Sequence, residues 1–314
     1  MRITNQLDDL CLEGRPVVLA VGSFDGVHRG HQRGVGLAVE TARKAAGEAW
    51  VLTFDPHPAK ILKPETAPPL ITSALHKVRL IEELGVDGCV VMPFTRELAA
   101  EEPGDFLKRM KATVTGLTEL VVGENWTFGH RGRGDVALLQ KLAPGLGFSA
   151  TVVAPIVWKN AAISSTRVRQ AVSKGHLSDA REMLGRPFSI LGTVVSGKRL
   201  GRQLGFPTAN LDPHNEVRPP SGVYAVQVLV HGRTLNGAAF LAETREAPST
   251  PSGFVTEVHI MDFDEDIYGA DIEVLFIEWL RAAQHFDSRG ALKKQIGLDV
   301  QKARDILEET RHGR

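Results

Sequence analysis

Residues 17–31 place a short apolar run, a glycine-rich turn and a pair of histidines directly after one another. The run Val-Val-Leu-Ala-Val is continuously apolar, which is typical of a parallel strand that is buried on both faces. Gly22 and Gly26 lack the Cβ atoms that would keep the backbone away from a phosphate chain. His28 and His31 stand three residues apart where a helix is expected to begin, so both point toward its electropositive end. The stretch therefore predicts a strand, a turn and a helix N-terminus that together bind phosphate groups.

The histidine pair has two other interpretations on the residues alone. Histidines at i and i+3 are sometimes half of a metal site, but no cysteine or acidic residue stands at ligand spacing beside them, and Asp25 falls within the turn itself. A histidine near a helix start is also often a surface residue with a purely structural role. Both alternatives stay open, and we favour the phosphate site.

The segment Gly-Ser-Phe-Asp-Gly-Val-His-Arg-Gly-His at residues 22–31 resembles the H-x-G-H motif of the nucleotidyltransferase superfamily. Its form is similar to that of the bacterial bifunctional riboflavin kinase/FAD synthetases. The resemblance implies adenylyl transfer, in which an incoming phosphate attacks the α-phosphorus of ATP and pyrophosphate leaves. Because negative charge accumulates on phosphate oxygens, positioned imidazoles and N–H groups can supply the catalysis. The resemblance implies that the catalytic residues are His28 and His31, and that ATP is bound by Gly22, Phe24, Asp25, Gly26 and Gly30.

The length of 314 residues exceeds what one ordinary core fills and predicts two domains. Lys and Arg together number 37, as do Asp and Glu, so the overall charge does not steer the protein toward nucleic acid or a membrane surface. No apolar stretch approaches the roughly 20 residues that span a bilayer. Cys11 and Cys89 are too few for a disulfide framework. We therefore expect a cytoplasmic protein whose partners are small molecules, neither nucleic acid nor membrane, with the oligomeric state open.

Strand and helix patterns alternate through the first half of the chain. Apolar runs predict strands at residues 49–54, 88–92, 119–122 and 148–153, with helices between them. This alternation favours a doubly wound parallel sheet, and the resemblance implies that it is the Rossmann-like sheet of a nucleotidyltransferase. Gly-Arg-Pro after Leu184 predicts the end of this domain, so we expect domains at residues 1–185 and 186–314.

Two loops of the first half are candidates for binding the nucleotide or the flavin. An Asp-Pro-His-Pro turn stands at the carboxyl end of a predicted strand, where parallel sheets bind ligands. It resembles the family's F-x-P-H-P element, which implies contacts from His57 and Pro58. The loop at residues 123–134, rich in glycine and arginine, could on its own be a mobile loop or an RNA-binding segment. It also resembles a glycine-rich loop of the family, which implies that Asn125 and Phe128 bind nucleotide or flavin.

The segment Ile-Ser-Ser-Thr-Arg-Val-Arg at residues 163–169 predicts the start of another helix. Ser164 is a good N-cap by itself, which is a purely structural interpretation. A helix N-terminus with hydroxyl groups and an arginine is also a second phosphate cradle. The segment resembles the family's I-S-S-T-R-x-R element, which implies that the β- and γ-phosphates of ATP are bound by Ser164, Thr166 and Arg167.

From residue 188 onward the pattern changes to short β-rich runs separated by turns, followed by a helix at residues 289–310. This pattern predicts an antiparallel β-barrel with a terminal helix, and the resemblance implies that the barrel is riboflavin-kinase-like.

One segment of the second half looks like a phosphate-binding P-loop but does not fit that motif. Residues 192–199 are one residue short of a Walker A loop, Arg199 stands where a magnesium-binding Ser or Thr is needed, and no helix pattern follows.

The motif Gly-Phe-Pro-Thr-Ala-Asn at residues 205–210 is the most informative one of the second half. By itself it could be only a strand connection, but it closely resembles a motif of riboflavin kinases. The resemblance implies that a Mg²⁺ ion on the ATP phosphates takes oxygen ligands from Thr208 and Asn210. It also implies that Lys198 neutralises phosphate charge and that Glu257 is the general base for the 5′-hydroxyl of riboflavin. Without the family, a glutamate in an alternating strand is more often solvent-facing.

Two departures from the family pattern weaken the kinase half. Residues 236–253 lack the N-x-G-x-R-P-T segment, and residues 280–288 lack the carboxylate of L-R-x-E-x-x-F-D-S. Our leading hypothesis is an enzyme that converts riboflavin to FMN and FMN to FAD, with ATP as co-substrate and Mg²⁺. The alternatives are an FMN adenylyltransferase whose barrel only binds flavin, and a non-catalytic flavin sensor or interaction protein.

Overall fold

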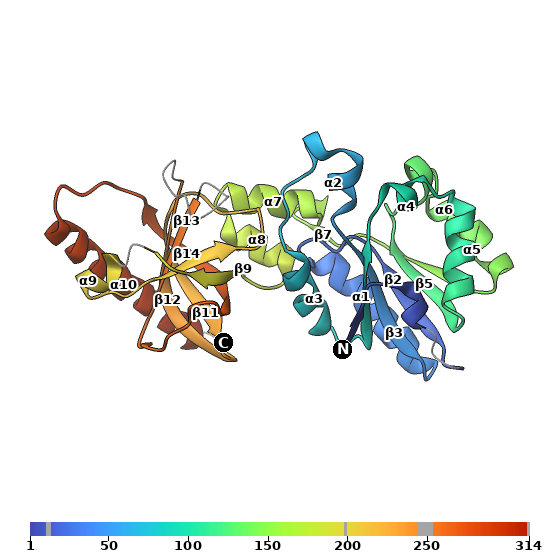
Figure 1. The fold of residues 1–314 in the computed structure, drawn as a ribbon, viewed down its shortest axis with the longest axis horizontal. Coiled ribbons are helices and arrows are strands. Elements are labelled where there is room, and N and C mark those ends of the chain that lie inside the picture. The colour runs from blue at the N-terminus through green and yellow to red at the C-terminus, as the bar shows by residue number, and fades with distance from the viewer. Residues whose placement is uncertain (11–13, 198–199, 244–253, 313–314) are drawn as a thin grey trace. The chain divides into compact units, whose positions relative to one another are not determined.

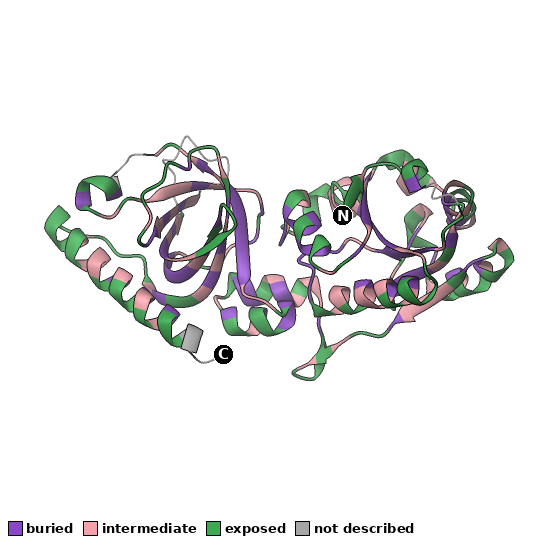
Figure 2. Cartoon of the chain, turned by 90° about the horizontal axis from the view of Figure 1, so that it is seen from below, coloured by how far each residue is buried: buried purple, intermediate pink, exposed green. Residues whose placement is uncertain are grey.

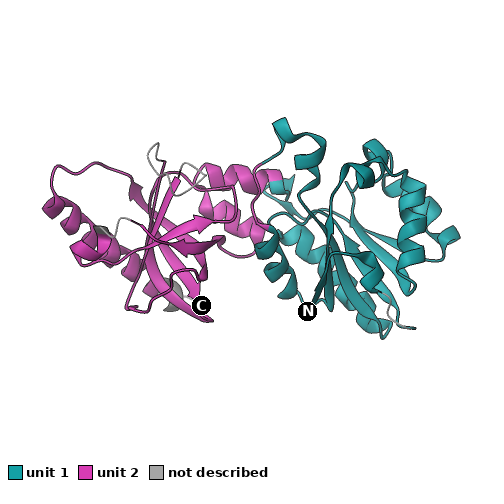
Figure 3. Cartoon of the chain, in the orientation of Figure 1, with its two compact units in different colours: residues 1–68, 74–165 teal, residues 69–73, 166–314 magenta. Residues whose placement is uncertain are grey.

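The computed structural model describes residues 1–10, 14–197, 200–243 and 254–312. The chain divides into two compact units (Figure 3): residues 1–68 with 74–165 form the first, and residues 69–73 with 166–314 form the second. Most of helix α7 (Ser165–Ser173) and all of α8 (Leu177–Leu184), which the sequence assigned to the first domain, group with the second unit. The domain boundary after residue 185 stays a prediction.

The first unit is built on a six-stranded sheet (Figure 1) in the order β1-β4-β3-β2-β5-β6. All neighbouring strands are parallel. The chain passes from β2 outward through β3 and β4 on one side, and then places β5 and β6 on the other side. The carboxyl ends of β2 and β5 therefore border the switch point, where open parallel sheets bind ligands. The strands are β1 (Arg2–Thr4), β2 (Val17–Val21), β3 (Glu48–Asp55), β4 (Gly88–Pro93), β5 (Leu117–Gly123) and β6 (Ser149–Val153).

Apolar side chains of β2 form cores on both faces of the sheet. Val18 and Ala20 pack in one core with α1 and α3, whereas Leu19 and Val21 pack in the other with α5 and α6. Buried residues concentrate in the strands, while the helices carry exposed residues along one side (Figure 2). The continuously apolar run of β2 is thus explained by burial on both faces. The helices are η1 (Leu7–Leu10), α1 (Arg29–Lys44), α2 (Pro58–Leu62), η2 (Pro64–Thr66), α3 (Ala74–Glu82), α4 (Arg96–Ala100), α5 (Pro103–Thr113), η3 (His130–Gly132), α6 (Val136–Leu142) and η4 (Pro144–Leu146).

The second unit contains a closed antiparallel barrel in the order β10-β13-β12-β11-β14-β9. The terminal helix α10 (Arg289–His312) packs Ala303 and Leu307 against Val223 and Leu280 of the barrel. Both parts of the predicted fold class, the doubly wound parallel sheet and the antiparallel barrel with a terminal helix, are confirmed. The remaining elements are β9 (Phe188–Val195), α9 (Leu200–Leu204), β10 (Ala209–Pro213), β11 (Gly222–Val230), β12 (Arg233–Glu243), β13 (Phe254–Ile260) and β14 (Asp271–Ala282), with the hairpin β7 (Val157–Trp158) and β8 (Ala161–Ala162) before α7.

Four strands were not predicted: β1, β10 and the two-residue strands β7 and β8 of one hairpin. Strand β1 has only three residues, two of them exposed, so it is too short to show an alternating pattern. Strand β10 begins inside the Gly-Phe-Pro-Thr-Ala-Asn motif, whose glycine and proline indicate a turn. Its pairing with β9 and β13 completes the barrel.

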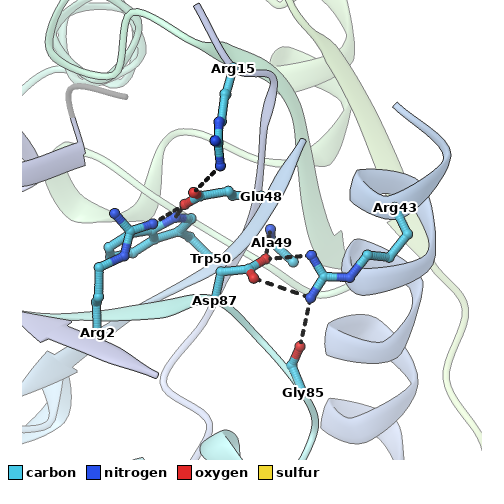
Figure 4. Close-up of polar contacts among 8 residues, drawn as sticks. All are labelled: Arg2, Arg15, Arg43, Glu48, Ala49, Trp50, Gly85 and Asp87. Carbon is cyan, nitrogen blue, oxygen red and sulfur yellow. Dashed lines mark hydrogen bonds and ion pairs between the residues drawn. The ribbon is translucent and has the colours of Figure 1, made fainter. Parts of the chain in front are cut away.

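Asp87 joins three elements at the amino edge of the parallel sheet (Figure 4). Its carboxylate accepts hydrogen bonds from the Ala49 N–H at 2.8 Å and from the Arg43 guanidinium at 2.9 and 3.1 Å. Partial burial opposes its ionisation, but the hydrogen bonds from Arg43 and Ala49 outweigh burial and lower the pKa of Asp87. The last turn of α1 is thereby tied to the start of β3 and to the residue before β4.

Glu48 forms a second cluster at the same edge (Figure 4). Its carboxylate accepts the indole N–H of Trp50 at 3.0 Å and pairs with Arg2 and, at 3.5 Å, with Arg15. The Arg2 guanidinium lies over the Trp50 ring, 4.8 Å from its centroid. The amino edge is therefore occupied by ion pairs, while the predicted site lies at the opposite edge.

Candidate active sites

His28 lies at the junction between the turn that follows β2 and the helix α1. It is the N-cap of α1, and its Nδ1 accepts a hydrogen bond from the backbone N–H of His31 at 3.3 Å. Only 6% of the residue is exposed. Because Nδ1 is an acceptor, the neutral ring carries its proton on Nε2. His28 therefore caps the helix and has an Nε2–H group that can donate to a phosphate oxygen.

The turn before His28 has an unusual backbone. Gly26 adopts a φ of +81°, which favours glycine, but Phe24 and Val27 also have positive φ values, of 49° and 41°. Non-glycine residues in this region are strained, and such residues cluster at functional sites. A hydrogen bond from the Val27 N–H to the Phe24 carbonyl, 3.0 Å long, holds the turn. We interpret the strain as a mark of function at the carboxyl end of β2.

The two imidazoles lie against each other. The ring centroids of His28 and His31 are 3.6 Å apart with planes 14° apart, and Phe24 meets His31 edge-on with centroids 5.2 Å apart. A Cβ added to Gly30 would come within 3.1 Å of the His28 ring, so glycine leaves room for that ring. One short segment thus brings together the predicted residues Gly22, Phe24, Asp25, Gly26, His28, Gly30 and His31, whose roles stay predictions.

The segment expected to bind the β- and γ-phosphates begins beside this turn. The hydroxyl of Ser165, the first residue of α7, donates to the carbonyl of Asp25 at 2.9 Å, and Asp25 is only 3% exposed. Ser164 precedes Ser165 in the first unit. Thr166 and Arg167 belong to the second unit, so their part in phosphate binding stays a prediction.

His57 and Pro58 open α2 just beyond the carboxyl end of β3. His57 is the N-cap of α2, and its Nδ1 accepts the Ala59 N–H at 3.1 Å, while Pro58 is the first helical residue. Both are half-buried. The local sequence therefore explains why the turn leads into a helix, and binding of nucleotide or flavin by these two residues stays a prediction.

Asn125 and Phe128 occupy different surroundings in the loop after β5. Asn125 is exposed. Phe128 is 7% exposed and packs in the core, stacked on Trp126 with centroids 4.4 Å apart and near Phe106 at 6.1 Å. The ring of Phe128 therefore anchors the loop to the apolar core. Ligand binding by Asn125 and by Phe128 stays a prediction.

Glu257 lies in the barrel with Asn210 on one side and Phe240 on the other. In the strand register, Glu257 of β13 is paired with Asn210 of β10 and with Phe240 of β12. The predicted base and one predicted metal ligand are thus neighbours across two strands, although they stand far apart in the sequence. Phe240 comes from the segment that departs from the family pattern.

Two cavities of the second unit share Thr208. One, of about 430 Å³, is lined by residues including Arg202, Thr208 and Tyr268. The other, of about 410 Å³, is lined by residues including Thr208, Glu257 and Phe286. Thr208 therefore borders both cavities.

The residues around Thr208 fit a hard cation. Thr208, Asn210 and Glu257 offer oxygen atoms, the ligands that Mg²⁺ prefers. Asn210 packs closely on Gly197, where an added Cβ would come within 2.1 Å of the amide nitrogen. Lys198 lies outside the described residues. Within the described ranges, no group of three or more His, Cys, Asp or Glu residues could hold a metal ion, so a cation here would need phosphate oxygens and water as further ligands.

Two contacts beside the second cavity were not predicted from the sequence. His259 lies 2.8 Å from the Pro207 carbonyl through Nδ1, which identifies Nδ1–H as the donor. It stands two residues after Glu257, and the period of two along a strand could have placed both on one face. Arg281, in the second departing segment, pairs with Asp299 of α10 at 2.7 Å. That pair joins distant segments, so no local pattern could have indicated it.

Comparisons with known proteins match both units. The FAD synthetase family model matches residues 12–167, and the riboflavin kinase family model matches residues 184–307. A bifunctional riboflavin kinase/FMN adenylyltransferase of Escherichia coli K12 is 38% identical over 94% of this chain and 94% of its own length. A protein of the same description from Pseudomonas fluorescens is 34% identical over 99% of this chain and 100% of its own length.

A solved structure from Streptococcus pneumoniae, described as a macrolide-efflux protein, has the same fold. It superposes with a TM-score of 0.80 at 28% identity and covers 96% of this chain and 98% of that chain. In the described part of the present chain, no helix combines the length and the apolar character that crossing a membrane requires. The resemblance inferred from the sequence motifs is confirmed by the family models and by identity over nearly the whole length. The chain therefore belongs to the family of bifunctional riboflavin kinase/FMN adenylyltransferases.

Proposed function

We propose that this chain makes FAD from riboflavin in two ATP-dependent reactions. The barrel transfers the γ-phosphoryl group of ATP to the 5′-hydroxyl of riboflavin, giving FMN and ADP. The sheet unit transfers the adenylyl group of a second ATP to FMN, giving FAD and pyrophosphate. The sequence supports the kinase activity less strongly than adenylyl transfer. The observation that supports the kinase activity is that Thr208 lines two cavities, one of which is also lined by Glu257. Phosphoryl donor and acceptor can then meet at one residue.

In adenylyl transfer, an oxygen of the FMN phosphate attacks the α-phosphorus of ATP. The bond from that phosphorus to the bridging oxygen breaks, and pyrophosphate leaves with the electron pair. His28 and His31 stand where α1 begins, so their N–H groups and the helix dipole can stabilise the negative charge of the transition state. The stacking of the two rings restricts their motion, and donors fixed in advance need no reorganisation during the reaction.

In the kinase reaction, Glu257 takes the proton of the riboflavin 5′-hydroxyl as that oxygen attacks the γ-phosphorus. ADP leaves with the electron pair of the broken bond. Thr208 and Asn210 are the residues that would hold Mg²⁺, which when bound neutralises phosphate charge. Phe240, next to Glu257 in the barrel, limits the access of water to the base from that side.

One product analysis tests both halves. Purified protein is incubated with ATP and Mg²⁺ and with either riboflavin or FMN, and the flavins are separated by chromatography. We expect FMN and FAD from riboflavin, and FAD from FMN. FAD formed from FMN, with no product from riboflavin, would support the adenylyltransferase-only alternative. Formation of neither product would contradict the proposal.

We also propose that the protein works in the cytoplasm on small molecules. The equal numbers of basic and acidic residues, 37 each, support this because they give no overall attraction to nucleic acid or anionic lipid. Cell fractionation followed by immunoblotting tests the location. Recovery in the membrane fraction would contradict it.

A further inference from the structure

Lys77 is a basic side chain in the interior of the first unit. It lies on α3, and only 6% of the residue is exposed. Its helix neighbours Val78 and Ile81 belong to the apolar core on one face of the sheet. An ammonium group removed from water needs polar partners within the protein. The partners of Lys77 therefore indicate why the chain keeps a charge there.

Those partners lie in the turn after β2 and at the carboxyl end of β3. The Lys77 Nζ donates to the carbonyl of Phe54 at 2.9 Å and to the carbonyl of Ser23 at 3.2 Å. Ser23 lies in the turn that leads to the two histidines, and Phe54 directly precedes the Asp-Pro-His-Pro turn. The hydroxyl of Thr53 donates to the same Ser23 carbonyl at 3.1 Å. One side chain is thus bonded to the histidine turn and to the end of β3 from which the Asp-Pro-His-Pro turn starts.

The charges around Lys77 favour the same arrangement. Burial lowers the pKa of Lys77, and the carboxylates of Asp25 and Asp55 act in the opposite direction. Burial also raises the pKa of the nearby Cys89 thiol to about 12, so this thiol is neutral at pH 7. Asp25 lies in the histidine turn and Asp55 begins the Asp-Pro-His-Pro turn, so the ammonium is attracted to both turns, and it is bonded to the first turn and to the strand end before the second.

We propose that Lys77 is a positioning residue for adenylyl transfer, which holds the histidine turn and the Asp-Pro-His-Pro turn at a fixed separation. A buried charge is a weak device for stability, because apolar side chains of similar volume often stabilise a core as well or better. An apolar side chain cannot bond two carbonyls, however, and so cannot fix two loops relative to each other. The proposal rests on the adenylyl transfer proposed above for this unit.

Substitution of Lys77 by methionine tests the proposal, because it keeps the length of the side chain and removes the charge and the donors. We expect kcat for FAD formation from FMN and ATP to fall about 10- to 100-fold, since a small misplacement of reacting groups costs up to about 100-fold. The KM values for both substrates should change by less than about 3-fold, because the residue acts on alignment. Riboflavin phosphorylation by the same protein should stay within about 2-fold, because it uses the other unit.

Lys111→Met is the matched control. Lys111 is a half-buried lysine of the same unit and donates to one carbonyl, that of Leu117 at 2.7 Å, but it lies at the opposite edge of the sheet. We expect Lys111→Met to leave kcat within about 2-fold of wild type, even if it lowers the thermal stability of the protein as much as Lys77→Met does. Lys77→Arg, which keeps the charge and the donors, should restore most of kcat. Equal kcat for Lys77→Met and wild type, or equal loss in the Lys111 variant, would overturn the proposal.

Amide hydrogen exchange gives a readout that does not need activity. In Lys77→Met, residues 22–27 and 55–59 should lose protection together, while the barrel strands keep theirs. If this variant does not accumulate, Lys77→Gln decides, because its shorter side chain keeps a polar donor but cannot bond both the Ser23 and Phe54 carbonyls, and it should lower kcat about 3-fold or more. Unchanged exchange in either segment of Lys77→Met, or unchanged kcat in Lys77→Gln, would contradict the proposal. A wild-type protein that makes no FAD would instead contradict the proposed function, and the exchange result would still decide whether Lys77 joins the loops.

Discussion

The two units arrange their predicted phosphate-binding residues in different ways. In the sheet unit, the turn, the capping histidine and the helix N-terminus belong to one continuous segment, residues 22–31. In the barrel, Asn210, Glu257 and Phe240 come from three strands and become neighbours only through strand pairing. The first site is therefore local, whereas the second requires a closed barrel. Because the two sites lie in different units, we expect that a substitution can remove one activity and leave the other unchanged. The following substitutions test this expectation.

Glu257→Gln should have the largest effect. It removes the proposed general base while keeping the shape of the side chain, and general bases contribute about 10²- to 10⁴-fold. We expect riboflavin phosphorylation to fall by about that factor and FAD formation from FMN to stay unchanged, as measured by chromatography of both products. Glu278→Gln, an exposed glutamate on β14, is the control and should retain both activities. Parallel loss of both activities in Glu257→Gln would refute the independence of the sites.

His31→Ala should produce the opposite pattern. Loss of one preorganised donor to a developing phosphate charge costs about 10²- to 10³-fold. We expect FAD formation to fall by that factor and riboflavin phosphorylation to stay unchanged. Pyrophosphate release measures the rate of FAD formation. His176→Ala removes an exposed histidine that lies outside both proposed sites, and it should leave both rates unchanged. A His31 variant with full FAD synthesis would disprove the assigned role.

Thr208→Val tests the shared wall of the barrel cavities. The substitution keeps the branched shape but removes the hydroxyl, and loss of one polar contact to a charged group corresponds to roughly a tenfold change. We expect KM for ATP in the kinase reaction to rise about tenfold and the apparent affinity for Mg²⁺ to weaken. Titrations of initial rate against ATP and against Mg²⁺ measure both quantities. Unaltered titrations would contradict the proposed role of Thr208 in binding Mg²⁺ and ATP.

Asp87→Asn should have the smallest effect and none on catalysis, because Asp87 lies at the amino edge of the sheet. We expect a loss of about 1 kcal/mol in the free energy of unfolding of the first unit, reduced by solvent screening. The pKa of Asp87 is lowered in the folded protein, so its contribution is present above the pKa of the unfolded chain and is lost as pH falls through the folded value. Denaturation curves of variant and wild type should therefore differ at pH 7 and converge in acid.

The difference between local and distant contacts also explains how much the sequence could predict. The strand–turn–helix at residues 17–31 has a recognisable order of apolar, glycine and histidine residues, so its fold and its place at the sheet edge could be predicted. The neighbourhood of Asn210 and Glu257 depends on strand register, which no local pattern specifies. Strand β10 was missed because the glycine and proline that precede it indicate a turn.

Buried polar residues were the hardest to predict. Lys77 lies in a helix whose periodicity could have assigned it to the interior, but a lysine in such a pattern is normally taken as exposed. Its partners, the Ser23 and Phe54 carbonyls, are backbone atoms that no sequence motif identifies. The pairing of Arg281 with Asp299 likewise depends on how α10 packs on β14.

The position of Thr208 between two cavities has a consequence for ligand design. A flavin analogue that is covalently tethered to an adenosine moiety could place one ring system in each cavity, with the tether passing over this side chain. Binding of the second ring system would then be intramolecular, so the local concentration at the second cavity would be set by the tether length. Such a compound should compete with both substrates of the barrel, and the optimal tether would report the distance between the two binding sites.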